Sequence, residues 1–297
     1  MTLRDGLQDA TPISTEEKLA LFDALILAGI KDMEVTSFAR PDRVPAMADA
    51  DRFARDVVDR QSDATLWGLV LNLRGAERAL ASGLTHLQFV VSVSEPHNLE
   101  NTGQTIEASI AGLASIVSMA DEASAVVEVT LATAFGCPFA GPVPLERVIE
   151  VARKVAALGV TNFSLADTIG VAVPREVGEL VGAIKSELGL EELGVHLHNT
   201  RGLAIANALR ALEAGATRLD GTVGGLGGCP FAPGASGNLV LEDLVHALDA
   251  MDEPSGIDLV RLVEASTKAC ELTGHPQESH VAVAGARFSN LAVTAQR

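Results

Sequence analysis

Short apolar runs alternate with longer stretches of helical periodicity along the chain. The apolar runs predict strands at 32–37, 65–71, 86–93, 125–133, 162–167, 194–198 and 217–222. The stretches between them predict helices such as 15–28, 73–81, 105–122, 145–157, 174–188 and 202–214. Strands separated by helix-length crossovers indicate parallel βαβ units.

Four of the predicted helices end in the same way, with a glycine just before the next strand. These glycines are Gly29, Gly83, Gly159 and Gly215. Each stands at the position after a helix where the chain needs a left-handed backbone conformation, which glycine adopts without strain. The repeated stop indicates a regular cycle of strand and helix.

The first four residues, 1–4, predict a short eighth strand. Eight parallel strands favour a closed (β/α)₈ TIM barrel over an open doubly wound sheet. The tail 239–297 predicts two further helices, at about 239–251 and 258–273, and then a polar end. We therefore expect a single α/β domain over 1–297, with a C-terminal helical extension packed on the barrel.

The composition allows a large packed core. Hydrophobic residues make up 47% of the 297 residues and charged residues 21%, which excludes an intrinsically disordered chain. Aromatic residues make up only 3%, with one Trp and no Tyr. The core must then consist of Ala, Val and Leu, as in helices packed on a parallel sheet.

The formal net charge of −17 argues against nucleic acid and anionic membranes as partners, because like charges repel. An anionic substrate would need a metal ion or a local basic cluster to offset this charge. The sparse cysteines, together with the lack of a membrane-length apolar run or a signal-peptide pattern, predict a soluble cytoplasmic protein. A homodimer is expected because barrels often pair through outer helices.

Two histidines, His196 and His198, lie two residues apart in the predicted strand 194–198. Side chains alternate along a strand, so both imidazoles point to the same side of the sheet, near the end of the strand where barrel enzymes place their chemistry. A lone histidine would more often be structural, whereas a pair in this arrangement favours a shared metal ion.

Three charged residues could join the histidines. Asp5 precedes a glycine and by itself predicts only a turn, but strand 1 adjoins strand 8 in a closed barrel, so Asp5 could offer the same metal an oxygen. Glu34 stands inside an apolar strand, where a buried carboxylate needs a partner. Its natural partner is Arg4 on the neighbouring strand, and this ion pair could serve structure and catalysis alike.

Asp167 ends the predicted strand 162–167 and is a candidate for proton exchange, or else a cap for a turn or helix. The glycine-rich loop 224–238 predicts a lid or a backbone that closely contacts a ligand. It lacks the Lys-Ser/Thr ending of a phosphate-binding P-loop. Cys229 within it is a candidate proton donor. Cys137 has the same Gly-Cys-Pro-Phe-Ala context, so a structural role stays open for both cysteines.

Taken together, these motifs resemble the 3-hydroxy-3-methylglutaryl-CoA lyase family of metal-dependent lyase barrels, along nearly the whole chain. They are Arg-Asp-Gly-Leu-Gln at 4–8, Glu-Val-Thr-Ser-Phe at 34–38, Phe-Gly-Cys-Pro at 135–138, Ser-Leu-Ala-Asp-Thr-Ile-Gly at 164–170, His-Leu-His at 196–198 and the loop 225–238. The loop is the most specific of these motifs. His-x-His and Arg-Asp-Gly also occur in related synthases and aldolases.

The resemblance implies a set of ligands for a divalent cation, either Mg²⁺ or Mn²⁺, with Zn²⁺ as an alternative. The ligands would be Asp5, His196, His198 and Asn238. The cation would hold and polarise the hydroxyl group of a small acyl-CoA substrate.

The resemblance also implies roles for the neighbouring residues. Asp167 or a metal-bound histidine would take the hydroxyl proton, and Arg4, oriented by Glu34, would stabilise the enolate left by cleavage of the carbon–carbon bond. Cys229 would act in proton transfer to this enolate. The products would be acetyl-CoA and a 3-oxo acid, which is acetoacetate for 3-hydroxy-3-methylglutaryl-CoA.

The sequence departs from the family pattern where the substrate would be held. Asn-Thr-Arg-Gly at 199–202 replaces the usual Asp-Thr-Tyr-Gly, and Thr-Leu precedes Arg4 where the lyases more often have Gly-Pro. Arg-Pro-Asp-Arg at 40–43 replaces a family lysine, and an Asn and a Lys near the CoA fall at about Gly274 and Pro276. The metal and proton machinery is unchanged, so the pattern predicts the chemistry more sharply than the substrate.

Three alternatives stay open. A lyase of the same family could act on a different 3-hydroxy acid or thioester, with Arg201 meeting an extra carboxylate. A Claisen condensing enzyme of the isopropylmalate-synthase type is disfavoured by the loop around Cys229 and by the lack of a C-terminal regulatory domain. A non-enzymatic barrel is disfavoured because every catalytic and metal position holds a chemically competent residue.

Overall fold

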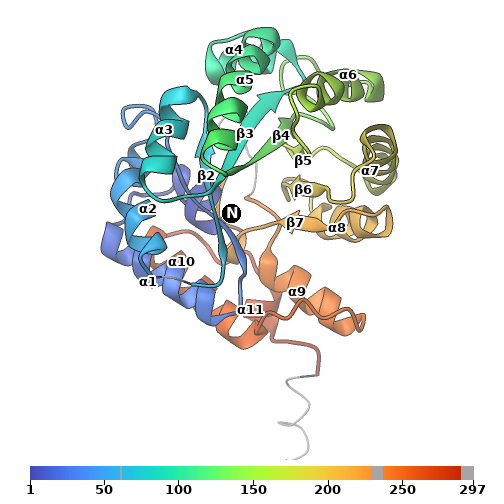
Figure 1. The fold of residues 1–297 in the computed structure, drawn as a ribbon. Coiled ribbons are helices and arrows are strands. Elements are labelled where there is room, and N and C mark those ends of the chain that lie inside the picture. Colours follow the sequence, from blue (N-terminus) through green and yellow to red (C-terminus); the bar gives the residue numbers. More distant parts are fainter. Residues whose placement is uncertain (61, 229–236, 289–297) are drawn as a thin grey trace, which may run out of the picture.

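The computed structural model describes residues 1–60, 62–228 and 237–288, which fold around one curled parallel sheet (Figure 1). Its seven strands follow one another in chain order, and each pairs in parallel with the next. The strands are β1 (Asp32–Ser37), β2 (Thr65–Val70), β3 (His86–Ser92), β4 (Val126–Ala132), β5 (Asn162–Asp167), β6 (Gly194–Leu197) and β7 (Arg218–Asp220). All seven lie within runs that the sequence predicts, so the α/β class with its β–α cycle is confirmed.

The helices form a ring outside the sheet (Figure 1). Helix α1 (Thr15–Leu27) precedes the first strand. The helices between the strands are α2 (Ala50–Val58), α3 (Leu73–Ala81), α4 (Glu95–Thr102), α5 (Ile106–Glu122), α6 (Leu145–Ala156), α7 (Pro174–Leu188) and α8 (Ala204–Glu213). Short turns of 3₁₀-helix form η2 (Pro45–Met47) and η3 (Val223–Gly225). None of the helices in the described part of the chain is long and apolar enough to cross a membrane.

Alternation along the strands separates an apolar outer layer from a polar interior. In β4, Val127, Val129 and Leu131 belong to the aliphatic core that the helices cover. Burying one such side chain stabilises the fold by about 1.5–3 kcal/mol. The alternate residues Glu128 and Thr130 face the axis of the sheet, where both bond the amide of Gln88 from β3. The inside of the curled sheet is therefore polar.

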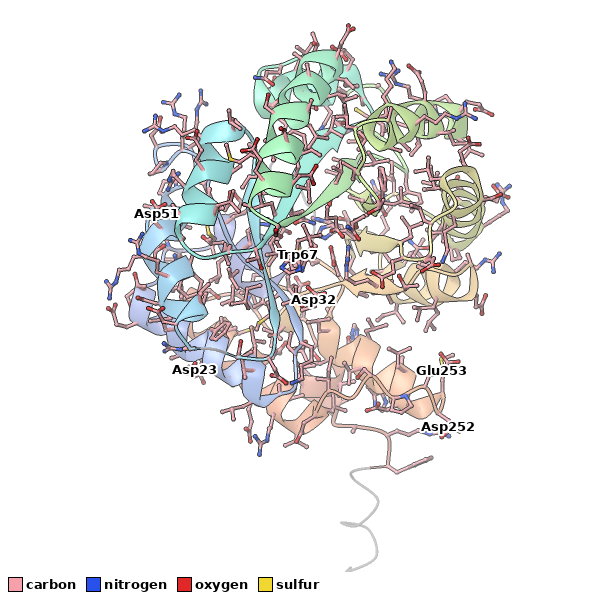
Figure 2. The ribbon with its side chains drawn as sticks, in the orientation of Figure 1. Asp23, Asp32, Asp51, Trp67, Asp252 and Glu253 are labelled. Atoms are coloured by element: carbon pink, nitrogen blue, oxygen red, sulfur yellow. The ribbon has the colours of Figure 1, made fainter. Side chains whose placement is uncertain are left out.

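The charge on the chain is distributed largely over the outer helices. Figure 2 shows Asp23, Asp51, Asp252 and Glu253 at the periphery, whereas Trp67 and Asp32 lie near the axis. This arrangement keeps most like charges apart and in contact with water. The interior is left with a small set of buried ionisable groups. Each of these groups needs a partner or a function to offset the cost of its burial.

The predicted eighth strand at 1–4 is wrong. Thr2–Gly6 instead forms one tight π-helical turn, η1, in which the backbone N–H groups of Arg4, Asp5 and Gly6 all donate to the carbonyl of Met1. These bonds satisfy groups that a strand would have offered to its neighbours. Among the described residues the sheet is therefore a curled seven-stranded sheet inside a ring of helices, which is a TIM-barrel-like α/β arrangement.

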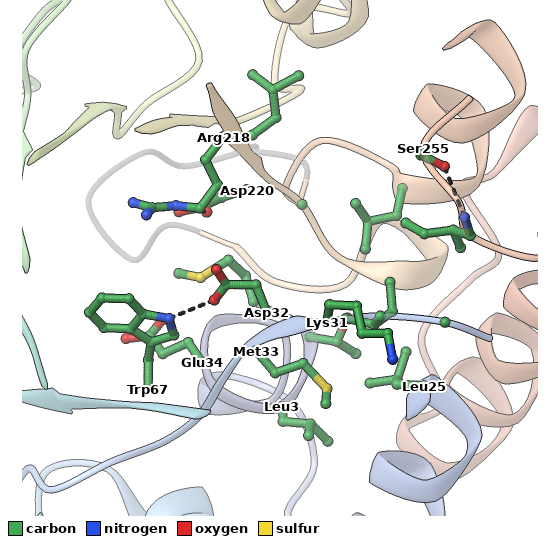
Figure 3. Close-up of a pocket in the computed structure, with 18 of the residues that line it drawn as sticks. Leu3, Leu25, Lys31, Asp32, Met33, Glu34, Trp67, Arg218, Asp220 and Ser255 are labelled. Atoms are coloured by element: carbon green, nitrogen blue, oxygen red, sulfur yellow. Dashed lines mark hydrogen bonds and ion pairs between the residues drawn. The ribbon is translucent and has the colours of Figure 1, made fainter. Parts of the chain in front are cut away.

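A cavity of about 270 Å³ lies where the sheet is open (Figure 3). It is lined from one side by β1, through Asp32 and Glu34, and from the other by β7, through Arg218 and Asp220. Met1 also lines it, and the start of the chain lies near the centre of the molecule (Figure 1).

In the part of the chain that the structure describes, three α-helices follow the last strand: α9 (Leu241–Ala250), α10 (Leu259–Thr273) and α11 (His280–Ala284). Helix α10 packs along α1, because the Asp258 N–H donates to the Ala28 carbonyl at 2.8 Å and Lys268 Nζ donates to the Ala20 carbonyl at 3.1 Å. Helix α10 is thereby attached to the first helix of the ring.

Candidate metal and active site

A second cavity, of about 610 Å³, opens at the carboxyl ends of the strands. Residues from the ends of β1, β3, β4, β5 and β6 line it, as does the η1 turn. This is the end of a parallel sheet where loops gather polar side chains and where barrel enzymes carry their chemistry. The sequence-predicted residues Arg4, Asp5, His196 and His198 all line this cavity.

The two histidines face each other at the end of β6. His196 lies in the strand and His198 follows it, and both are buried, with 7% and 6% of their surface exposed. Their Nε2 atoms are 3.2 Å apart. Burial, followed by the charge of His196, lowers the pKa of His198 to about 4. A neutral imidazole keeps a lone pair free, which is what metal coordination requires.

Asp5 completes a cluster with the histidines. One ligand atom from each of Asp5, His196 and His198 lies within 4.8 Å of the others. Burial opposes ionisation of Asp5, but Arg4, the two histidines and a hydrogen bond from Asn238 together hold its pKa well below its usual range. The cluster therefore offers one anionic oxygen and two imidazole nitrogens.

Asn238, which lies 233 positions after Asp5 in the sequence, brings a fourth group to the cluster. Its Nδ2 donates to Asp5 Oδ2 at 2.7 Å and to the Leu226 carbonyl at 3.1 Å. The side chain is fully buried, yet its Oδ1 has no hydrogen-bond partner among the described residues. A buried acceptor without a partner is costly, and a cation would satisfy it. Two oxygens and two imidazoles form a donor set that fits a divalent metal.

Arg4 stands beside this cluster and bonds carboxylates on both sides. Its Nε donates to Glu34 Oε2 at 2.6 Å and its Nη1 to Asp5 Oδ1 at 2.5 Å. Burial opposes the positive charge, but Glu34 and then Asp5 hold the pKa of Arg4 above its usual value. The predicted partnership of Arg4 with Glu34 is thus present, although Arg4 lies in the η1 turn and not in a strand.

This chain also matches known proteins over most of its length. The model of the family described as HMGL-like matches residues 1–268. The chain belongs to the HMGL-like family. It is 38% identical over 277 residues to hydroxymethylglutaryl-CoA lyase YngG of Bacillus subtilis, covering 93% of this chain and 92% of that protein. It is 36% identical to (R)-citramalyl-CoA lyase of Chloroflexus aurantiacus, covering 95% and 92% of the two chains.

A solved structure agrees with this assignment. The HMG-CoA lyase from Acinetobacter baumannii, in complex with coenzyme A and 3-methylmalate, superposes with a TM-score of 0.92 at 39% identity, covering 97% of this chain and 94% of that one. Membership of the HMGL-like family accounts for the barrel-like ring of helices around the curled sheet. The resemblance stated from the motifs is confirmed.

Asp167 takes the position of a turn cap in this member of the HMGL-like family. Its two carboxylate oxygens accept hydrogen bonds from the backbone N–H groups of Val171, at 2.9 Å, and Ala172, at 3.0 Å. Burial raises the pKa of Asp167, against the opposing effect of these two bonds. Arg201 holds the same turn, because its Nη1 donates to the carbonyls of Ile169 and Gly170.

The two ends of the glycine-rich loop lie against each other, while Cys229 falls outside the described residues. A Cβ atom on Gly237 would lie 1.6 Å from the carbonyl oxygen of Gly225, so this close approach requires glycine. Cys137, whose role stayed open, is buried and accepts a hydrogen bond from Ser94 Oγ at 2.9 Å. This contact gives Cys137 a structural role.

Sequence reasoning missed one residue of the site, Asp220 on β7. Its Oδ2 lies 3.4 Å from Nδ1 of His196. Burial opposes ionisation of Asp220, but His196 and Arg218 lower its pKa from the usual value. A charged residue inside the predicted strand 217–222 was the available signal, and it is the same signal that singled out Glu34.

Proposed function

We propose that this protein is a divalent-metal-dependent carbon–carbon lyase that cleaves 3-hydroxy-3-methylglutaryl-CoA, or a close analogue, to acetyl-CoA and an oxo acid. The observation that carries the proposal is the convergence of Asp5, His196 and His198 beside the ion pair of Arg4 with Glu34. Relatives of this chain that carry the name hydroxymethylglutaryl-CoA lyase support the substrate class.

The metal site in this proposal consists of Asp5, His196, His198 and Asn238. When bound there, Mg²⁺ or Mn²⁺ would supply a Lewis acid that polarises the substrate hydroxyl. Asn238 orients Asp5 by donating a hydrogen bond to one of its oxygens. Arg4 bonds the other oxygen and keeps Asp5 ionised. These two contacts hold the carboxylate of Asp5 in place at the proposed site.

Asp167 is the proposed acceptor of the hydroxyl proton. Because burial raises its pKa, its carboxylate is a stronger base than an exposed aspartate and stays anchored by the turn that it caps. Arg4 then stabilises the negative charge that develops on the thioester as the carbon–carbon bond breaks. Glu34 fixes the guanidinium for this task, since a buried bond of 2.6 Å leaves it little freedom. Cys229 is the proposed participant in proton transfer to the enolate.

The acyl group separates two candidate substrates. One is 3-hydroxy-3-methylglutaryl-CoA, which relatives and structural neighbours name. The other is citramalyl-CoA, favoured by 36% identity to a citramalyl-CoA lyase over 95% of this chain. Both are hydroxy acyl thioesters that would leave acetyl-CoA, so the same Arg4 and Asp167 chemistry serves either.

The deciding experiment measures acetyl-CoA release from each thioester with Mg²⁺ or Mn²⁺, before and after addition of EDTA. Release that EDTA abolishes and excess metal restores is expected from at least one of them, and the ratio of kcat/KM values assigns the acyl group. Absence of metal-dependent release from both substrates would overturn the proposal.

A further inference from the structure

We propose that Asp220 is a positioning residue that fixes the ring of His196 so that its Nε2 faces the metal site. The inference rests on the proposed metal-dependent function. Asp220 touches none of the reacting groups, and it acts through the histidine. No sequence motif pointed to this role.

The geometry places the imidazole of His196 between two partners. In the parallel pairing of β6 with β7, His196 and Asp220 are direct neighbours. Nδ1 of His196 lies 3.4 Å from Asp220 Oδ2, while Nε2 on the other side of the ring lies 3.2 Å from Nε2 of His198. One edge of the ring therefore faces the carboxylate and the other faces the cluster with Asp5.

This arrangement matters because a neutral imidazole carries only one N–H. For Nε2 to offer its lone pair to a cation, the proton must sit on Nδ1, and a carboxylate next to Nδ1 favours this form. The contact of 3.4 Å is longer than an ordinary N–H···O hydrogen bond. Nδ1 has no hydrogen-bond partner among the described residues, so Asp220 is the group that faces it.

The competing explanation is that Asp220 only neutralises Arg218. The contacts of Asp220 argue against it. Arg218 is already paired with Glu128, and its Nε is 3.9 Å from Asp220. The carboxylate of Asp220 lies closer to Nδ1 of His196, at 3.4 Å, which favours a role towards the histidine.

The first test is the affinity for Mn²⁺, measured by titration calorimetry on the metal-free protein. Asp220→Ala should weaken binding about 10–100-fold, the usual effect of removing the partner of a metal-bound histidine. Asp220→Asn should weaken binding less, because its amide oxygen still accepts a hydrogen bond from Nδ1 while the charge is lost. It also serves as the informative variant if the alanine variant does not fold.

Asp32→Asn is the matched control. Asp32 lines the same cavity as Asp220 and accepts a hydrogen bond from Trp67 Nε1, so its substitution removes the same charge without touching His196. Its Mn²⁺ affinity should stay within about twofold of the wild type, far from the 10–100-fold loss expected when a histidine loses its partner. An equal loss of affinity in Asp220→Ala and Asp32→Asn would show that the charge in the cavity is the cause and would overturn the inference. Wild-type affinity in both Asp220→Ala and Asp220→Asn would overturn it as well. A wild-type protein that binds no Mn²⁺ would instead overturn the proposed metal site.

A second readout follows the ring itself. In metal-free protein with ¹⁵N-labelled histidine, the side-chain nitrogen shifts of His196 should report a proton on Nδ1. In Asp220→Ala the shifts should move towards a mixture of the two neutral forms, whereas in Asp32→Asn they should not. Unchanged shifts in Asp220→Ala would contradict the positioning role, because a merely structural aspartate leaves this signature unaffected.

Discussion

Arg4 Nε donates to Glu34 Oε2 across 2.6 Å, and both side chains are buried. The bond joins the η1 turn to β1 and sets a guanidinium beside the cluster of Asp5, His196 and His198. A buried charge pair of this kind is weak evidence for stability, since desolvation offsets much of the attraction. Its placement next to Asp5 fits the catalytic role proposed for Arg4.

Replacement of Arg4 should therefore affect turnover more than substrate binding. Arg4→Gln is expected to lower kcat about 10²–10³-fold, because it removes a donor that stabilises charge mainly in the transition state. Arg4→Lys keeps the charge but loses the planar guanidinium, so its kcat should lie between that of the wild type and that of Arg4→Gln. Steady-state kinetics on the thioester substrate measure both variants, and a change confined to KM would contradict the assigned role.

The double variant His196→Ala/His198→Ala should lose measurable Mn²⁺ binding and keep its fold. The expectation follows from the facing Nε2 atoms, which lie 3.2 Å apart. Calorimetry measures the binding, and far-ultraviolet circular dichroism with a melting curve measures the fold. Tight binding retained in this variant would refute the ligand assignment, and a large loss of stability with binding intact would make the histidines structural.

Cys229→Ala should abolish turnover while Mn²⁺ still binds with wild-type affinity. The reason is that the proposed role of Cys229 is proton transfer and not metal coordination. Cys137→Ala is the matched control, because Cys137 has the same sequence context but is buried against Ser94. Wild-type kcat in the Cys229 variant would remove this residue from the mechanism.

Gly237→Ala should reduce both stability and metal affinity. Its Cβ would meet the Gly225 carbonyl at 1.6 Å, so the backbone next to Asn238 would have to move. Gly182→Ala is the control: it lies exposed in α7 with open space around its Cβ, and it should stabilise the helix by about 0.5–1 kcal/mol. Urea unfolding and Mn²⁺ titration of the pair separate steric strain from the general effect of adding a methyl group.

Glu128 lines the cavity at the open side of the sheet, and it should make the stability of the protein depend on pH. Burial, together with the nearby acids Asp220 and Asp32, raises its pKa from 4.5 to about 7, against the effect of Arg218. The folded state therefore holds a proton that the unfolded state has released. The resulting stability is fully present below pH 4.5 and is lost as the pH rises to about 7.

Urea unfolding in EDTA at several pH values tests this expectation. The free energy of unfolding of the wild type should fall with rising pH by up to about 1.4 kcal/mol per unit more than that of Glu128→Gln. Glu253→Gln, at an exposed position, should follow the wild type. Parallel curves for the wild type and Glu128→Gln would exclude Glu128 as the source.

The strands and most of the site could be predicted because their signals are local. Apolar runs predicted all seven strands, and glycines at the ends of four helices marked where the next strand begins. Alternation along the strand placed His196 and His198 on the same side of the sheet. The prediction for 1–4 failed because a run of that length can satisfy its N–H groups in a turn as well as in a strand, and η1 does so through the Met1 carbonyl. Asp220 was missed because the charge within its predicted strand gains its meaning only from the pairing of that strand with His196, which lies far away in the sequence.

The hydrogen bond from Asn238 to Asp5 joins residues 233 positions apart. A second bond, from the Val223 N–H to Thr2 Oγ1, spans 221 positions. During synthesis Asp5 leaves the ribosome first, and Asn238 follows only after 233 further positions of the chain. The complete set of ligands cannot exist on a nascent chain before that moment, and closing so long a loop is entropically costly and slow. On the proposed assignment, the four-ligand cation site would therefore be completed only late in folding.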